Sequence, residues 1–192
     1  MRIISGKYRG RRLTVPKNLP VRPTTDMNRE TLFNILNNYY DFAGLRVLDL
    51  FAGTGGVSYE FASRGAESIT AVDQNAGCAR FIRQTATELD VPIEVVQGDA
   101  FKFLEKSRLE YDVIFADPFY DLAQDDFEKI HRLIFENGLL SAEGMFILEH
   151  SKQTSLEHLE HFSFSRKYGS TVFSFFEFES EEEEELSNGA TE

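Results

Sequence analysis

The sequence predicts an α/β fold with a doubly wound, mostly parallel seven-stranded sheet. Three observations indicate this fold. Short apolar runs alternate with helical patterns after residue 45, a glycine-rich turn follows the first run, and two β-prone segments end the ordered part. Alternating strands and helices favour a parallel sheet covered on both faces, whereas two strands joined by a short turn favour an antiparallel hairpin.

The chain begins with a basic arm and a helix. Residues 2–6 and 11–15 are short β-prone runs, and they predict a hairpin or an extended arm. A helix is expected to start near Pro-Thr-Thr-Asp, with Thr25 or Asp26 as its N-cap. Its apolar positions extend to about Tyr40.

The stretch 45–56, Leu-Arg-Val-Leu-Asp-Leu-Phe-Ala-Gly-Thr-Gly-Gly, organises the remaining chain. Residues 47–51 are typical of a buried parallel strand, although Asp49 interrupts the apolar run. The glycines predict a tight turn in which backbone can approach a ligand closely, and a helix follows from Val57 to about Arg64. A strand, a glycine turn and a helix N-terminus together favour a nucleotide-type ligand.

The same periodicities predict the later elements. Further strands are expected at 68–72, 92–96, 111–116 and 145–148, helices at 75–89, 100–106, 125–135 and 152–160, and a terminal hairpin at 162–167 and 171–178.

These patterns divide the chain into three parts: residues 1–44 as arm and helix, residues 45–178 as the α/β domain, and residues 179–192 as an acidic tail. The tail contains five consecutive glutamates and offers nothing for a core, so we expect it to be disordered.

The net charge of −12 conceals a strong asymmetry. Residues 1–46 carry nine Lys or Arg and three Asp or Glu, whereas the remaining chain carries 11 and 29. Local charge decides where a polyanion binds, so the arm is a candidate phosphate-binding segment, with Tyr8 available for stacking. The alternative is a charged edge strand that only prevents aggregation.

The composition narrows the class of protein. One cysteine excludes a disulfide framework, and the N-terminus lacks the apolar segment of a signal peptide. No apolar run has the length of a membrane span. We therefore expect a cytoplasmic protein. The four histidines and Cys78 show no metal-ligand spacing, so no metal is expected.

Carboxylates occur where predicted strands end. Asp73 ends the second strand, about twenty residues after the glycines, where a carboxylate binds ribose hydroxyls. Asp99 follows the third strand, either as a helix N-cap or as a ligand contact. The Gly-x-Gly-Gly spacing differs from the dinucleotide fingerprint. Together with Asp49, this pattern resembles the S-adenosylmethionine pocket of Rossmann-like class I methyltransferases.

The fourth strand runs directly into Asp117-Pro118-Phe119-Tyr120. Pro118 fixes its own φ and restricts Asp117 to extended conformations. A carboxylate, a rigid turn and an aromatic at this edge favour a catalytic site, whereas an ordinary strand-to-helix turn with Tyr120 in the core is the alternative.

The chain resembles the RsmD family of bacterial methyltransferases over about residues 1–178. That resemblance implies transfer of a methyl group to the N2 amine of a guanine in 16S rRNA. The motifs that carry it are Arg2-Ile-Ile-Ser-Gly6, Arg9-Gly-Arg-Arg-Leu13, Arg22-Pro-Thr-Thr-Asp26, Arg29-Glu-Thr-Leu-Phe-Asn34, Leu48-Asp-Leu-Phe-Ala-Gly-Thr-Gly55, Asp117-Pro118 with Tyr120, and Lys167-Tyr-Gly169. The chain departs from the family at Phe119, usually proline, and at Met27, usually basic.

The resemblance implies roles for individual residues. The catalytic set is Asp117, Pro118 and Tyr120. The S-adenosylmethionine set is Asp49, Phe51, Ala52, Gly53, Gly55, Asp73, Gln74, Asp99, Ala100 and Asp117. The RNA-binding set is Arg2, Lys7, Arg9, Arg11, Arg12, Arg22, Arg29 and Phe119. Salt bridging to nearby acids is the alternative for Arg22 and Arg29. The expected partner is 16S rRNA, in the small ribosomal subunit or an assembly intermediate, bound by a monomer.

Three other functions stay open from the sequence. The Asp-Pro-x-Tyr turn also suits the N6 amine of adenine in DNA or RNA. A non-catalytic RNA-binding assembly protein that retains the pocket is a second alternative, and the departure at Phe119 keeps it open. A nicotinamide dehydrogenase is disfavoured by the glycine spacing.

Overall fold

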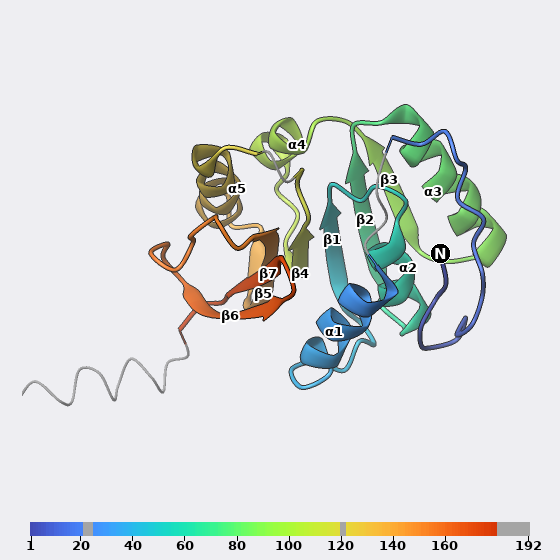
Figure 1. Ribbon diagram of the computed structural model, residues 1–192, viewed down its shortest axis with the longest axis horizontal. Helices are drawn as coiled ribbons and strands as arrows, with labels where there is room; N and C mark the ends of the chain where they lie inside the picture. The colour runs from blue at the N-terminus through green and yellow to red at the C-terminus, as the bar shows by residue number, and fades with distance from the viewer. Residues whose placement is uncertain (21–24, 120–121, 180–192) are drawn as a thin grey trace, which may run out of the picture.

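The computed structural model describes residues 1–20, 25–119 and 122–179. Its centre is a seven-stranded sheet with strand order β3-β2-β1-β4-β5-β7-β6 (Figure 1). The strands are β1 (Arg46–Leu50), β2 (Ser68–Asp73), β3 (Ile93–Gln97), β4 (Tyr111–Ala116), β5 (Leu140–Ser151), β6 (Phe162–Tyr168) and β7 (Thr171–Phe176). Strands β1–β5 are parallel, and β7 and β6 are antiparallel additions. This confirms the predicted fold class.

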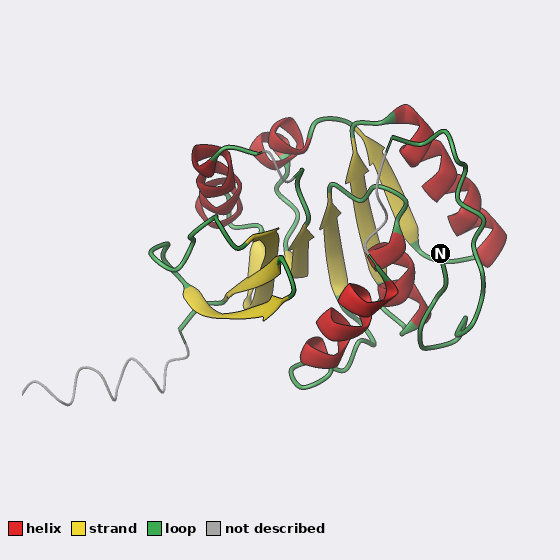
Figure 2. Ribbon diagram, in the orientation of Figure 1, coloured by secondary structure: helices red, strands yellow, loops and turns green. Residues whose placement is uncertain are grey.

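Helices cover both faces of the sheet (Figure 2). They are α1 (Asp26–Leu36), α2 (Gly56–Ser63), α3 (Ala76–Leu89), α4 (Ala100–Lys106) and α5 (Gln124–Glu136). Apolar side chains of α1 and α2 pack in one core with Val47 of β1, and those of α4 and α5 pack in another with Leu48. Because neighbouring strand residues point to opposite faces, both cores use the same strands. Within the described residues, no helix combines the length and the apolar character needed to cross a membrane.

Three local expectations differ from the structure. Helix α1 ends at Leu36 rather than near Tyr40, because Asn37 and Asn38 lead into a turn. Residues 152–160 form turns instead of the expected helix, since Leu156 is their only buried side chain. Strand β5 begins at Leu140, earlier than expected. The predicted cap is confirmed: the Thr25 side chain accepts a hydrogen bond from Asn28 N at 3.1 Å.

The N-terminal arm is an extended, hairpin-like segment with one antiparallel bridge, between Arg2 and Arg12. The arm therefore has fewer cross-strand backbone hydrogen bonds than a regular two-stranded hairpin. Its apolar residues Ile3 and Leu13 are buried against α2 and α3, in a core that includes Tyr59. The arm is thus part of the folded domain.

Ser63, the last residue of α2, fastens the arm. Its carbonyl accepts from Lys7 N at 2.7 Å, its hydroxyl donates to Ser5 O at 2.6 Å, and the same hydroxyl accepts from Tyr8 N at 3.0 Å. Such paired backbone groups are costly to break when buried. Gly6 lies inside this clamp with φ +79°.

Arg29 was expected to contact RNA, and the structure contradicts this. Its side chain is 1% exposed and donates to Arg2 O and to Asp26 Oδ1, both at 2.7 Å. A guanidinium held this way cannot reach a phosphate of an external RNA. Arg29 instead connects α1 to the arm. Arg22, Tyr120 and residues 180–192 of the expected tail at 179–192 lie outside the described residues.

We predict that Gly6→Ala destabilises the protein much more than Gly10→Ala. Both glycines have left-handed backbone, with φ of +79° and +82°. A Cβ at Gly6 would lie 1.9 Å from Ser63 O, whereas nothing lies within 4 Å of one at Gly10. The left-handed backbone should lower the free energy of unfolding by about 1 kcal/mol in either alanine variant. In Gly6→Ala, disruption of the hydrogen bonds to Ser63 should increase this loss to about 3 kcal/mol.

Urea unfolding of both variants measures this difference. Trypsin should also cleave the arm of Gly6→Ala faster. Equal stabilities would show that the clamp contributes nothing.

Candidate functional site

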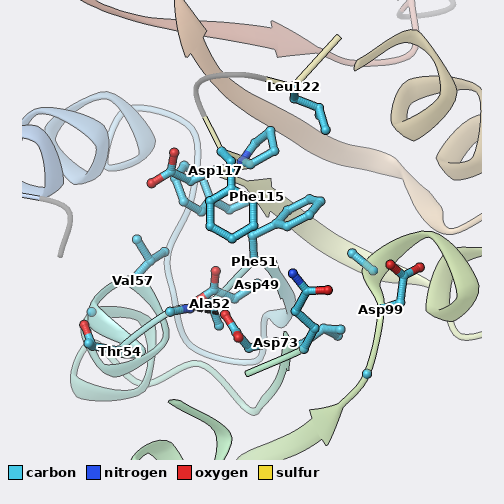
Figure 3. Close-up of a pocket in the computed structure, with 18 of the residues that line it drawn as sticks. Asp49, Phe51, Ala52, Thr54, Val57, Asp73, Asp99, Phe115, Asp117 and Leu122 are labelled. Atoms are coloured by element: carbon cyan, nitrogen blue, oxygen red, sulfur yellow. Dashed lines mark hydrogen bonds between the residues drawn. The ribbon is translucent and has the colours of Figure 1, made fainter. Parts of the chain in front are cut away.

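A cavity of about 330 Å³ opens at the carboxyl edge of the parallel strands (Figure 3). Its size is typical of sites for small organic ligands. The walls come from the segments that follow β1, β2, β3 and β4, which end at the same edge of the sheet. The lining residues are Pro20, Asp49, Phe51, Ala52, Gly53, Thr54, Gly56, Val57, Val72, Asp73, Gln74, Gly98, Asp99, Ala100, Phe101, Phe115, Asp117, Pro118, Phe119 and Leu122.

The glycine turn forms the floor of this cavity. Ala52 N donates to Val72 O at 2.9 Å, and Gly55 N donates to Ala52 O at 2.7 Å. Gly55 has φ +79°, and a Cβ there would lie 3.0 Å from the side chains of Tyr59 and Ile82. A larger residue at position 55 would therefore push the turn off α2. Gly55 shapes the turn without lining the cavity.

Asp49 connects β1 to the start of α2. Its Oδ2 accepts from Ser58 N at 3.1 Å and from Ser58 Oγ at 2.5 Å. The side chain is 2% exposed, and burial raises the pKa of Asp49 to about 7 while the Ser58 hydrogen bonds oppose this rise. The negative fields of Asp117 and Asp73 add to the shift. Asp49 is thus a buried carboxyl at the base of the site, fixed in orientation by Ser58.

Asp73 organises the rim next to the glycine turn. Its Oδ2 accepts from Gly53 N at 2.7 Å, and its Oδ1 accepts from Asn75 N at 2.8 Å. Burial raises the pKa of Asp73, against these backbone bonds. The two bonds fix the carboxylate plane, so it presents a preset acceptor to a ligand hydroxyl. This is the carboxylate position that contacts ribose in nucleotide-binding folds.

The position of Asp99 is compatible with both roles predicted from the sequence, helix N-cap and ligand contact. Its Oδ1 accepts from Lys102 N at 2.9 Å and caps α4, and the residue also lines the cavity. In Figure 3, Asp99 and Asp117 lie on opposite sides of the cavity. A ligand that spans the cavity would therefore meet a carboxylate at each side.

Aromatic side chains line much of the remaining wall. Phe51 and Phe101 pack edge to face with ring centroids 6.4 Å apart, and Phe115 adds a buried ring from β4. Such faces bind planar rings through apolar contact and stacking. The pocket thus combines aromatic surface with acidic acceptors.

The turn after β4 borders the cavity on the other side. Asp117 and Pro118 line it, and Phe119 is 55% exposed beside it. Leu122 N donates to Phe119 O at 3.0 Å, which ties Leu122 to the end of this turn. An exposed phenylalanine ring at a cavity mouth is costly in water and is available for stacking.

Nearly all of the sequence-predicted pocket residues line the cavity. The exceptions are Gly55, which shapes it indirectly, and Tyr120, which lies outside the described residues. Gly56, one of the glycines expected to let backbone approach a ligand, also lines the cavity. Eight lining residues were not predicted: Pro20, Thr54, Val57, Val72, Gly98, Phe101, Phe115 and Leu122. Most of these residues are next in sequence to predicted pocket residues, and that proximity could have identified them. No such signal exists for Pro20, because it reaches the cavity from the distant arm.

The predicted RNA-binding residues of the arm are on the surface. Arg2, Lys7, Arg9, Arg11 and Arg12 are exposed. The arm ends at Leu19 and Pro20, and Leu19 contacts α3 close to Gly77 while Pro20 lines the cavity. The arm is therefore a basic surface that continues to the mouth of the pocket.

Comparisons with known proteins agree with this geometry. The model of the family described as conserved hypothetical protein 95 matches residues 1–177. Ribosomal RNA small subunit methyltransferase D of Escherichia coli strain K12 is 33% identical over 157 residues, covering 81% of this chain and 77% of that protein.

Solved structures of other proteins share this fold. The yhhF protein of Escherichia coli has a TM-score of 0.81 at 28% identity, covering 94% of this chain and 99% of that one. The 16S rRNA N2 G1207 methyltransferase RsmC of Thermus thermophilus shares the fold at 19% identity, with a TM-score of 0.67, covering 81% of this chain and 44% of that one. From the family model and the identity to methyltransferase D, the chain belongs to the RsmD family.

Proposed function

We propose that this protein transfers a methyl group from S-adenosylmethionine to the exocyclic N2 amine of a guanine in small-subunit (16S) rRNA. The observation that carries the proposal is one cavity shared by a nucleoside-type pocket and the Asp117-Pro118 turn. Family membership supports the rRNA substrate, since the matched relative is named a small-subunit rRNA methyltransferase. RsmC, which shares the fold, is described as acting on a guanine N2.

The lining residues fit S-adenosylmethionine. Asp73, held by Gly53 and Asn75, would accept from the ribose hydroxyls. Phe51 and Phe101 would pack against the adenine, with Asp99 and the backbone at Ala100 at its polar edge. When bound, S-adenosylmethionine supplies a methyl group that its sulfonium charge has already activated.

The protein must then align a weak nucleophile. The lone pair of the guanine N2 amine is delocalised into the ring, so alignment and exclusion of water contribute most of the rate. The Asp117 carboxylate accepts one N–H of this amine, and the Pro118 carbonyl accepts the other. These two acceptors orient the lone pair toward the methyl carbon.

The target base has to leave its RNA context to reach this cavity. Enzymes that modify a base in nucleic acid extrude it and hold it by stacking. Phe119, exposed at the mouth, is the described residue placed to stack on it. Because phenylalanine lacks a hydroxyl, its contact with the base is stacking only, and it tolerates any planar ring.

The basic arm would bind the RNA backbone. Phosphate contacts set position without reading sequence, and exposed Arg9, Arg11 and Arg12 suit this task. The arm is clamped to α2 and ends at the pocket, so phosphates bound there would hold the RNA at a fixed distance from Asp117.

Methyl transfer from labelled S-adenosylmethionine tests the proposal. The substrates are small ribosomal subunits and naked 16S rRNA that lack the modification, followed by digestion to nucleosides. We expect the label in N2-methylguanosine. Label in N6-methyladenosine would move the activity to adenine, and cofactor binding without label in any nucleoside would indicate a binding protein.

We predict that Asp117→Ala lowers methyl transfer by roughly a hundredfold or more, because it removes a preorganised acceptor. The dissociation constant of S-adenosylmethionine, measured by calorimetry, should stay within about threefold of wild type. Asp125→Ala, which removes an exposed carboxylate in the first turn of α5, is the control and should transfer normally. Loss of cofactor binding together with turnover in Asp117→Ala would contradict a catalytic role.

We predict that removing Arg9 and Arg11 weakens RNA binding and flattens its salt dependence. Each lost phosphate contact reduces the slope of log K against log salt by about 0.7–0.9. The matched control removes Lys106, the last residue of α4, and Arg108, in the segment before β4, both exposed and outside the arm. Filter binding at several salt concentrations measures both double variants. Equal slopes would exclude the arm from the RNA interface.

A further inference from the structure

Glu149, near the end of β5, is a buried carboxyl that the site described above does not use. Its side chain is 3% exposed, and its Oε2 has no hydrogen-bond partner among the described residues. A buried polar atom without a partner is costly, so such an atom calls for a specific explanation.

The strand register places Glu149 beside Asp117. Strands β4 and β5 are parallel neighbours, with Phe115 opposite Ile147 and Ala116 opposite Leu148. The next position sets Asp117 next to Glu149, across a strand spacing of about 4.8 Å. Phe115 and Ile147 belong to the same core, so the two carboxyls, two residues further along, project from that same face.

The surroundings of Glu149 favour its neutral, protonated form. Burial raises the pKa of Glu149, and the field of Asp117 raises it further. On the other side, β7 places Phe173 opposite Glu149, and Tyr168 of β6 packs against that ring. Asp49, on β1 beyond β4, has its own partner in Ser58.

When two carboxyls lie side by side and one of them is buried, the charge of the first opposes ionisation of the second. Asp117 lines the cavity and is partly exposed, whereas Glu149 is buried. The proton therefore resides on Glu149, and the charge resides on Asp117.

We propose that Glu149, protonated beside Asp117, is a positioning residue that donates its O–H to the Asp117 carboxylate and keeps a second negative charge out of the site. This inference rests on the proposed function. With one Asp117 oxygen engaged by Glu149, the other is aimed at the substrate amine.

The proton and electron balance follows from this arrangement. The N–C bond forms from the amine lone pair, and the S–C bond breaks with its electron pair staying on sulfur. The surplus proton of the amine passes to the Asp117 carboxylate and then to water. Glu149 keeps its own proton throughout, so the pair returns to a single negative charge.

Two substitutions separate positioning from packing. Glu149→Gln keeps the shape and an N–H donor toward Asp117, and it should keep methyl transfer within about threefold of wild type. Glu149→Leu keeps the volume without a donor, and it should lower kcat by roughly tenfold or more with an unchanged KM for S-adenosylmethionine. The wild-type rate should fall at alkaline pH as Glu149 ionises, and the fall should be weaker in Glu149→Gln.

An infrared difference spectrum between wild type and Glu149→Gln provides a readout independent of activity. At pH 8 it should contain the carbonyl band of one protonated carboxylic acid. In Asp117→Asn, which removes the neighbouring charge, that band should disappear at a lower pH than in wild type.

The outcomes are distinguishable. Absence of the band, an unaltered alkaline fall in Glu149→Gln, or equal damage from Gln and Leu would overturn the inference. If wild type transfers no methyl group to rRNA while the band is present, the proposed function fails and the protonation of Glu149 stands. If Glu149→Leu does not fold, the Gln variant and the spectrum decide.

Discussion

The hydrogen bonds between Asp49 and Ser58 fix the relation of strand β1 to helix α2, and the pocket depends on that relation. A carboxyl buried inside a strand is unfavourable unless the fold supplies donors. Ser58 supplies its backbone N–H and its hydroxyl to one oxygen, at 3.1 and 2.5 Å. The intervening glycine turn is thereby closed at both ends, and Asp73 then secures Gly53 from the neighbouring strand.

Helix α2 also carries the N-terminal arm, so the same helix positions both halves of the proposed site. Its first residues follow the glycine turn, and its last residue, Ser63, clamps the arm. The basic surface of the arm and the cavity are thus both positioned by one short helix. A chain with a net charge of −12 therefore still carries a locally basic surface, the feature on which the proposed RNA contact rests.

The sequence was sufficient for the fold and for the acidic positions of the pocket, because both follow from periodicity. Parallel strands end at one edge, so Asp73, Asp99 and Asp117 had to gather there once the strands were placed. Side-chain burial was less predictable. Arg29 looked like an RNA contact, yet its partners are the Arg2 carbonyl and Asp26. Glu149 lies just after the predicted strand 145–148, and its position beside Asp117 follows from the β4–β5 register, which no local pattern encodes.

In the proposed enzyme, the cavity holds the methyl donor with its reactive carbon facing the Asp117-Pro118 turn. A crystal structure of the protein with S-adenosylmethionine tests this arrangement most directly. We expect the ribose at Asp73, the adenine between Phe51 and Asp99, and the sulfonium methyl directed toward Asp117 and Phe119. A ligand bound in another place, or bound here with its methyl facing away from Asp117, would contradict the account.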